Sequence, residues 1–151
     1  EDLDSLIAPV GGGGLLAGTS LAVKHFSPET LVFGAEPEGA ADAVLSIASG
    51  HVESAPYINT IADGLLTTLS AKTLSVIREE VQEILLVSDA DIIHAMRLLF
   101  ERAKLVVEPS GAASLAALIR HRDRFSGQRV GVISSGGNVD LSKVSQWMTG
   151  I

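Results

Sequence analysis

The glycines of this chain are the residues whose spacing has the clearest chemical meaning. One cluster consists of Gly11, Gly12, Gly13 and Gly14 between two apolar segments, and Gly136 and Gly137 follow another apolar segment. Glycine inside a helix or strand costs roughly 0.5–1 kcal/mol relative to alanine, so such a run indicates that bare backbone is needed. N–H groups at the start of a helix attract anions, because they lack partners within the helix and the dipole favours negative charge. We therefore expect a phosphate group at the first cluster.

Two kinds of phosphate ligand are compatible with this loop. Residues 12–17 match the pattern G-x-G-x-x-A of dinucleotide-binding proteins, and Glu36 ends the next apolar segment, where an acidic residue would bind the ribose of NAD. A short loop with four amides suits a single phosphate monoester, such as pyridoxal phosphate, equally well. The glycines could also form only a tight turn with close helix–strand packing. The loop pattern alone does not decide among these.

The glycines must be positioned by the elements around them, and apolar runs that alternate with helical patterns predict those elements. We expect strands over residues 6–10, 31–35, 84–87 and 129–133. We expect helices over residues 15–25, 40–49, 69–81, 88–104, 110–121 and 141–148, with a loop over 51–60. Continuous apolar strands that alternate with helices are typical of an α/β fold with a mostly parallel open sheet and helices on both faces.

Several element ends carry specific signals. Ser88, with Asp91 three residues later, predicts an N-cap resembling a capping box, although Glu or Gln is the usual partner. Ser110 is expected to cap the helix that follows it, and Gly50 to end the helix over 40–49. Pro9 should lie near the end of its strand, because proline cannot donate to the ladder.

Composition excludes several classes of protein. With 151 residues, 46% hydrophobic and 19% charged, the chain should form one globular domain. The net charge of −7 argues against a nucleic-acid partner, which requires clustered Lys and Arg. No apolar run reaches the ~18 residues of a membrane span, and no signal peptide is recognisable. The absence of cysteine excludes disulfide and thiolate chemistry. We expect a cytoplasmic enzyme or a part of one.

Five motifs follow one another along the chain: APVGGGGLLAG, GAEP, IADG, VEPSGA and SSGGNVD. In this order they resemble the C-terminal half of the serine racemase and threonine/serine dehydratase family, which are fold-type II pyridoxal-phosphate enzymes. The likeness extends from Leu6 to about Trp147. It implies a small amino-acid substrate, no nucleic acid or membrane partner, and a homo-oligomer, dimeric or tetrameric, in the intact enzyme.

The resemblance implies a cofactor site for pyridoxal 5'-phosphate. Its residues would be Gly11, Gly12, Gly13, Gly14, Leu15, Gly64, Glu108 and Ser135, with the glycine N–H groups on the phosphate. Ser135 would hydrogen-bond the pyridine nitrogen, while Gly64 would lie near the cofactor and Glu108 near the floor of the site. A neutral hydroxyl leaves that nitrogen largely unprotonated and so weakens the electron sink. Family members of this type favour β-elimination and racemisation over transamination.

The resemblance also implies a divalent cation beside the phosphate loop. Glu36, the Ala40 carbonyl and Asp42 match the spacing of its ligands in the family. Oxygen ligands suit Mg²⁺, Mn²⁺ or Ca²⁺ rather than zinc. Without the resemblance, the same residues read as a strand-end glutamate and an aspartate favoured by a helix dipole.

No lysine has the setting that the family requires. Such enzymes bind the cofactor through a lysine in a Ser-Phe-Lys-like motif, whereas the lysines here are Lys24, Lys72, Lys104 and Lys143, all interpreted as solvated. The Ser-Gly-Asn-His-like loop that grips the substrate carboxylate is absent too. We therefore expect residues 1–151 to be the C-terminal part of the cofactor-binding large domain, inactive alone and lacking the half with the catalytic lysine.

The intact enzyme would dehydrate L-threonine or L-serine to a 2-oxo acid and ammonia, or racemise serine. Nothing in the sequence separates serine, threonine and hydroxyaspartate as substrates. Two alternatives remain at this point: an NAD-binding domain of a dehydrogenase, which would leave residues 134–138 unexplained, and a non-catalytic module kept for assembly.

Overall fold

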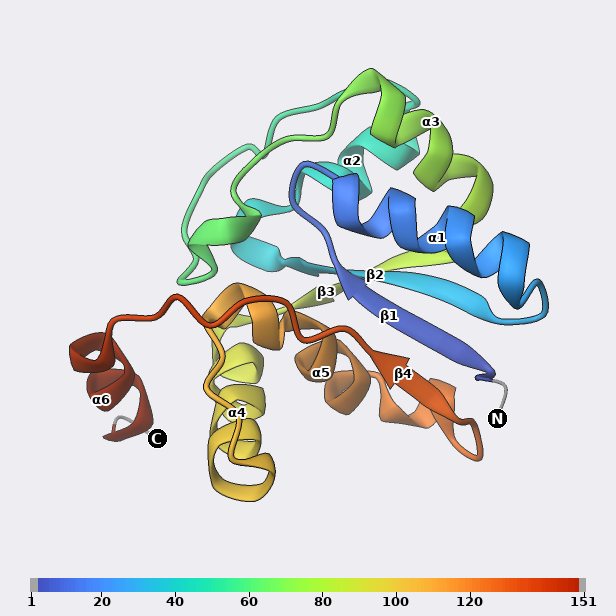
Figure 1. The fold of residues 1–151 in the computed structure, drawn as a ribbon. Coiled ribbons are helices and arrows are strands. Elements are labelled where there is room, and N and C mark those ends of the chain that lie inside the picture. Colours follow the sequence, from blue (N-terminus) through green and yellow to red (C-terminus); the bar gives the residue numbers. More distant parts are fainter. Residues whose placement is uncertain (1–2, 150–151) are drawn as a thin grey trace.

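A parallel sheet forms the centre of the computed structural model, which describes residues 3–149 (Figure 1). Within those residues four strands pair in the order β3-β2-β1-β4, every neighbouring pair in parallel. They are β1 (Ser5–Pro9), β2 (Leu31–Pro37), β3 (Glu83–Val87) and β4 (Val130–Val132). The prediction of an α/β fold with a parallel sheet is therefore confirmed.

Helices cover the sheet on both sides (Figure 1). One face carries α1 (Gly14–Phe26), α2 (Asp42–Ser49) and α3 (Ala71–Glu80), and the other carries α4 (Asp89–Leu98) and α5 (Pro109–Arg120). The last helix, α6 (Leu141–Thr149), contacts α4. Short helical turns are η1 (Glu38–Ala40), η2 (Asp63–Leu65), η3 (Leu99–Ala103) and η4 (Arg122–Phe125).

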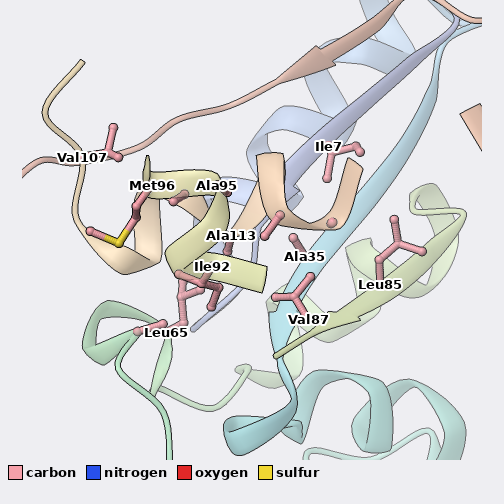
Figure 2. Close-up of a cluster of buried hydrophobic side chains, with 14 of the residues drawn as sticks. Ile7, Ala35, Leu65, Leu85, Val87, Ile92, Ala95, Met96, Val107 and Ala113 are labelled. Carbon is pink, nitrogen blue, oxygen red and sulfur yellow. The ribbon is translucent and has the colours of Figure 1, made fainter. Parts of the chain in front are cut away.

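Two hydrophobic cores explain why the strands read as continuous apolar runs. In β1, Ile7 belongs to the core under α4 and α5, whereas its neighbour Ala8 belongs to the core under α1 and α3. Figure 2 shows the first core, in which Ala35 of β2 and Val87 of β3 lie beside Ile92 of α4. Since successive side chains of a strand point to opposite faces, a sheet covered on both sides needs apolar residues at both.

Most signals at the element ends are confirmed. Ser88 and Asp91 form a reciprocal capping box at the start of α4. Gly50 follows α2 with φ 80°, the left-handed conformation that glycine adopts most easily. Pro9 is the last residue of β1.

The prediction that Ser110 caps a helix is wrong. Glu108 occupies the N-cap position of α5, Pro109 is its first residue, and Ser110 lies inside the helix. Proline is well suited to the first helical position, because its missing N–H would have no partner there and its φ is already helical. The cap therefore lies one residue before the proline, and the Ser110 hydroxyl is available for another contact.

The helix expected over 69–81 spans Ala71–Glu80, and two further helix boundaries differ from the prediction. The helix expected from residue 40 begins at Asp42, because Glu38–Ala40 form a separate turn and Ala41 has non-helical dihedral angles. The helix expected to Lys104 is α-helical only to Leu98 and continues as a π-turn, η3. Lys104 then ends it with φ 59°.

Candidate functional site

The four glycines connect β1 to α1 at the carboxyl edge of the sheet. Gly13 is the N-cap of α1 with φ 81°, and a Cβ atom on it would lie 2.7 Å from Leu69 Cδ2 and 2.9 Å from Thr73 Cβ. No other residue fits there, because both the dihedral angle and the space exclude a side chain. Thr73 also fixes the loop, since its hydroxyl donates to the Gly12 carbonyl at 3.0 Å. By contrast, a Cβ atom on Gly14 would meet no atom within 4 Å.

The N–H groups of this loop are available to a ligand. In the part of the chain that the structure describes, the N–H groups of residues 11–16 donate to no acceptor. The next one, that of Ala17, begins the helical ladder by donating to the Gly13 carbonyl at 2.9 Å. Orphan donors at a helix start, with no side-chain cap, are a ready site for a phosphate group. The loop therefore fits an anionic ligand.

The glycine loop forms one wall of a cavity of about 200 Å³. All eight residues predicted for the cofactor line it: Gly11, Gly12, Gly13, Gly14, Leu15, Gly64, Glu108 and Ser135. They come from four segments that lie far apart in the sequence. The sequence analysis missed Pro9, Leu65 and Ser110, which line it as well. Ser110 was assigned to a helix cap, although its position two residues after Glu108 in the VEPSGA motif is a signal that could have revealed it.

The start of α5 holds the other walls of the cavity in place. Gly64 N–H donates to the Ser110 hydroxyl at 2.9 Å, and Asn138 N–H donates to Glu108 Oε2 at 3.0 Å. Gly111 allows the second glycine loop to approach, because a Cβ atom there would lie 2.6 Å from the Ser135 carbonyl oxygen. The Ser135 hydroxyl itself has no hydrogen-bond partner among residues 3–149. It is thus available to a ligand.

The predicted cation ligands gather around the start of α2. The side chain of Glu36, 1% exposed, accepts hydrogen bonds from Ala43 N–H at 2.6 Å and Val44 N–H at 3.1 Å. Burial raises the pKa of Glu36 to about 7, although these two hydrogen bonds act in the opposite direction. Ala40 ends η1 and is equally buried.

Asp42 is the residue of this group whose bonding is incomplete. It is 2% exposed, burial raises its pKa, and its Oδ2 atom has no hydrogen-bond partner within the described chain. A buried carboxylate oxygen without a partner is costly, so a bound cation would satisfy it. The residues from 3 to 149 contain no cluster of three His, Cys, Asp or Glu suited to a metal. A cation here would depend on two carboxylates, a carbonyl and water.

The lysines lie away from the cavity. Lys24, Lys72, Lys104 and Lys143 are all exposed, and none lines the glycine cavity. The cavity therefore offers donors for an anion but no amine of its own. None of the helices in the described part of the chain has the length and apolar character that a membrane span requires.

Comparisons with known proteins place these features in context. Residues 1–136 match the family model described as "Pyridoxal-phosphate dependent enzyme". The chain is 47% identical over 150 residues to a serine racemase of Dictyostelium discoideum, and the aligned region covers 97% of this chain and 46% of the relative. It is 45% identical over 149 residues to an L-threo-3-hydroxyaspartate ammonia-lyase of Pseudomonas sp, with coverage of 98% and 47%.

A solved structure agrees. The crystal structure of a threonine deaminase from T.th. superposes with a TM-score of 0.85 at 48% identity, covering 91% of this chain and 51% of that one. The chain spans about half the length of the curated relatives it matches.

Proposed function

This chain belongs to the family of pyridoxal-phosphate-dependent enzymes, and from that premise we propose that its glycine-lined cavity holds pyridoxal 5'-phosphate in a hydroxy-amino-acid dehydratase or racemase. The reaction would remove water from L-threonine or L-serine to give a 2-oxo acid and ammonia, or would racemise serine. The observation that carries this proposal is the row of N–H groups at residues 11–15, which have no acceptor in the described chain and belong to residues that line the cavity. Membership of this family leaves the NAD-binding alternative without support.

When bound, pyridoxal phosphate draws electrons from the substrate's Cα and weakens its bond to hydrogen. The glycine loop would bind the phosphate and so fix the ring in the cavity. Glu108 would hold residues 136–138 against the floor through its hydrogen bond from Asn138 N–H. Gly64, held by Ser110, would leave room for the ring.

Ser135 would determine which reactions follow. Its hydroxyl is neutral, so as a partner of the ring nitrogen it would leave that atom largely unprotonated, whereas a carboxylate would favour protonation. The weaker electron sink suits elimination and racemisation better than transamination. The names of the relatives, serine racemase, L-threo-3-hydroxyaspartate ammonia-lyase and threonine deaminase, support the same pair of reactions.

We propose that the lysine that attaches the cofactor lies outside this chain, in the part of the relatives that the chain does not match. Two observations support this: the chain spans about half the relatives' length, and its four lysines are exposed and away from the cavity. The chain would then be the C-terminal part of the large domain. It would bind the cofactor phosphate without lyase or racemase activity of its own.

A divalent cation, Mg²⁺, Mn²⁺ or Ca²⁺, is proposed at Glu36, the Ala40 carbonyl and Asp42. The buried Asp42 Oδ2 atom without a partner supports it, as does the oxygen-only donor set. A homo-oligomeric intact enzyme and a cytoplasmic location remain predictions.

The test is a titration of the purified protein with pyridoxal 5'-phosphate, followed by absorbance. Saturable binding that inorganic phosphate competes away, and that pyridoxal without its phosphate does not match, would support the proposal. Reduction with borohydride and intact-mass measurement would identify non-specific attachment to the exposed lysines. Saturable binding of NAD, with no binding of pyridoxal 5'-phosphate, would overturn the proposal. Cofactor binding with no turnover of serine or threonine is the result expected of a chain without the attaching lysine.

A further inference from the structure

Arg120, at the end of α5, connects two acidic residues on different elements. Its Nη2 atom lies 2.7 Å from Glu38 Oε1 on η1, and its Nη1 atom lies 2.8 Å from Asp91 Oδ2 on α4. The guanidinium group presents several donors in a fixed plane, so it can hold two carboxylates at once in a defined geometry. Arg120 therefore joins three elements that are far apart in the sequence.

Asp91 gives this bridge a rigid anchor. The same Oδ2 atom accepts hydrogen bonds from Ser88 N–H at 2.9 Å and from the Ser88 hydroxyl at 2.6 Å, as part of the capping box of α4. Burial of Asp91 opposes ionisation, but the bonds from Ser88 and then Arg120 outweigh it and lower the pKa of Asp91. The Asp91 carboxylate that Arg120 binds is thus fixed to the start of α4.

Further contacts tie η1 to the same helix end. Asn59 N–H donates to the Gly39 carbonyl at 2.8 Å, and the next residue, Thr60, donates from its hydroxyl to Asp89 Oδ1 at 2.5 Å. Ile61 N–H donates to Asp89 Oδ2 at 3.1 Å. These contacts close a ring that runs from η1 through residues 59–61 to the start of α4 and back through Arg120.

The short turn η1 needs such support. It has three residues, no side-chain cap and a non-helical residue, Ala41, after it, so its own hydrogen bonds do little to fix it. Its last residue is Ala40, whose carbonyl is the proposed cation ligand between Glu36 and Asp42. Glu38, two residues earlier, is the residue of the turn that Arg120 holds.

We propose that Arg120 is a positioning residue for the cation site: by joining Glu38 to Asp91 it fixes η1, and with it Ala40, relative to Glu36 and Asp42. This inference depends on the cation site proposed above. Arg120 itself touches neither the cation nor the cofactor cavity. Partners in the outer shell of metal ligands orient the ligands, and their loss typically lowers metal affinity by about 10–100-fold.

The experiment compares Mn²⁺ binding by the purified protein, measured by electron paramagnetic resonance of free Mn²⁺, in Arg120→Met and Arg124→Met. Arg124 is a matched control. Its side chain is 42% exposed, against 37% for Arg120, and it pairs with a single glutamate, Glu83, at the start of β3. Arg120→Met should weaken Mn²⁺ binding about tenfold, and Arg124→Met should leave it unchanged. Arg120→Lys should give an intermediate affinity, because one ammonium cannot replace the planar fork.

Amide hydrogen exchange without metal supplies a second readout. Residues 38–44 should exchange faster in Arg120→Met and at the wild-type rate in Arg124→Met. Glu38→Gln should weaken Mn²⁺ binding as well, and the double variant with Arg120→Met should lose no more than Arg120→Met alone, since Arg120→Met already removes the contact with Glu38.

Two failures are distinguishable. If the wild type does not bind Mn²⁺, or if Asp42→Asn binds it equally well, the cation site is wrong and this inference is overturned with it. If Asp42→Asn abolishes binding while Arg120→Met keeps wild-type affinity, only the role of Arg120 is overturned.

Discussion

Two neighbouring strands of this protein end in helix starts of opposite character. After β1, the chain enters α1 through bare glycines, and the first N–H groups have no acceptor in the described chain. After β2, it enters α2 beside Glu36, whose carboxylate accepts from the N–H groups of Ala43 and Val44. Both starts carry the same positive end of a helix dipole. The N–H groups at the start of α1 lack an acceptor among the described residues, whereas two of those at the start of α2 donate to a carboxyl side chain of the protein.

The difference explains why the two sites would take ligands of opposite charge. At α1 the unpaired donors and the dipole favour a phosphate group. At α2 the dipole is already matched by Glu36, and the added carboxylate of Asp42 leaves an unpaired buried oxygen. A divalent cation is the ligand that we propose for these two buried carboxyl groups. The same local geometry therefore gives different chemistry, depending on whether a glycine or a carboxylate occupies it.

The largest effect is expected from a side chain added to the glycine loop at the start of α1. Gly13→Ala should abolish binding of pyridoxal 5'-phosphate and destabilise the fold by roughly 1–3 kcal/mol, because the residue has positive φ and its Cβ would overlap Leu69 and Thr73. Titration with the cofactor and urea unfolding measure the two effects.

Gly127→Ala is the matched control for this variant. Gly127 has φ 79° but open space around its Cβ position, so its substitution carries the strain without the overlap. It should keep wild-type cofactor binding. Equal loss of binding in both variants would show that strain, and not the glycine loop, was being measured.

The stability of the fold should depend on the Glu36 side chain at the start of α2. Glu36→Ala should destabilise the protein by about 3 kcal/mol, because the N–H groups of Ala43, which is buried, and Val44, which is partly buried, lose their carboxyl acceptor. Glu36→Gln keeps one carbonyl oxygen as acceptor and should lose about half as much. Urea unfolding in chelator measures both. Equal stability of the alanine variant and the wild type would contradict the assignment of Glu36 as the partner of α2.

The effect of Asp42→Asn on the stability of the fold should change sign when the cation is added. In chelator it should be neutral or stabilising by up to about 1 kcal/mol, since it removes a buried charge whose Oδ2 has no partner. In saturating Mn²⁺ the wild type should be the more stable protein, because a ligand that binds the folded state adds to its stability. Thermal unfolding in both conditions tests this. If Mn²⁺ does not raise the thermal stability of the wild type, the start of α2 does not bind a cation and the two helix starts do not differ in the charge of their ligands.

The contrast between the two sites also marks what could be predicted from the sequence. The glycine loop and the parallel arrangement of strands were predictable, because a run of glycines indicates bare backbone and continuous apolar segments indicate strands covered on both faces, although the loop alone did not identify its ligand. That Gly11 and Ser135 lie near each other follows from β1 and β4, which end at the same edge of the sheet, whereas Gly64 and Glu108 were expected at the cavity only through the family resemblance.

Other contacts could not be predicted, because they depend on packing between distant elements. Ser110 resembled a cap, and its hydrogen bond from Gly64 N–H joins two segments that are 46 residues apart in the sequence. Nothing local to Arg120 indicates that Glu38 and Asp91 would lie on either side of it. The change from α-helix to π-turn after Leu98 likewise has no signal in the hydrophobic pattern.

The smallest effect is expected at a third helix start, that of α4, which can be compared with the starts of α1 and α2. Asp91 closes α4, and although burial opposes its ionisation, hydrogen bonds from Ser88 and Arg120 hold its pKa in the folded protein below the ordinary 3.8. A depressed pKa means that the carboxylate stabilises the fold above pH 3.8 and that this stability is lost as the pH falls through the lower folded value. Asp91→Asn should therefore cost about 1 kcal/mol at neutral pH, the typical value of a helix cap. The difference from the wild type should shrink below pH 3.8, as measured by urea unfolding at each pH. A difference that is constant with pH would mean that the shape of the side chain, and not its charge, closes this helix start.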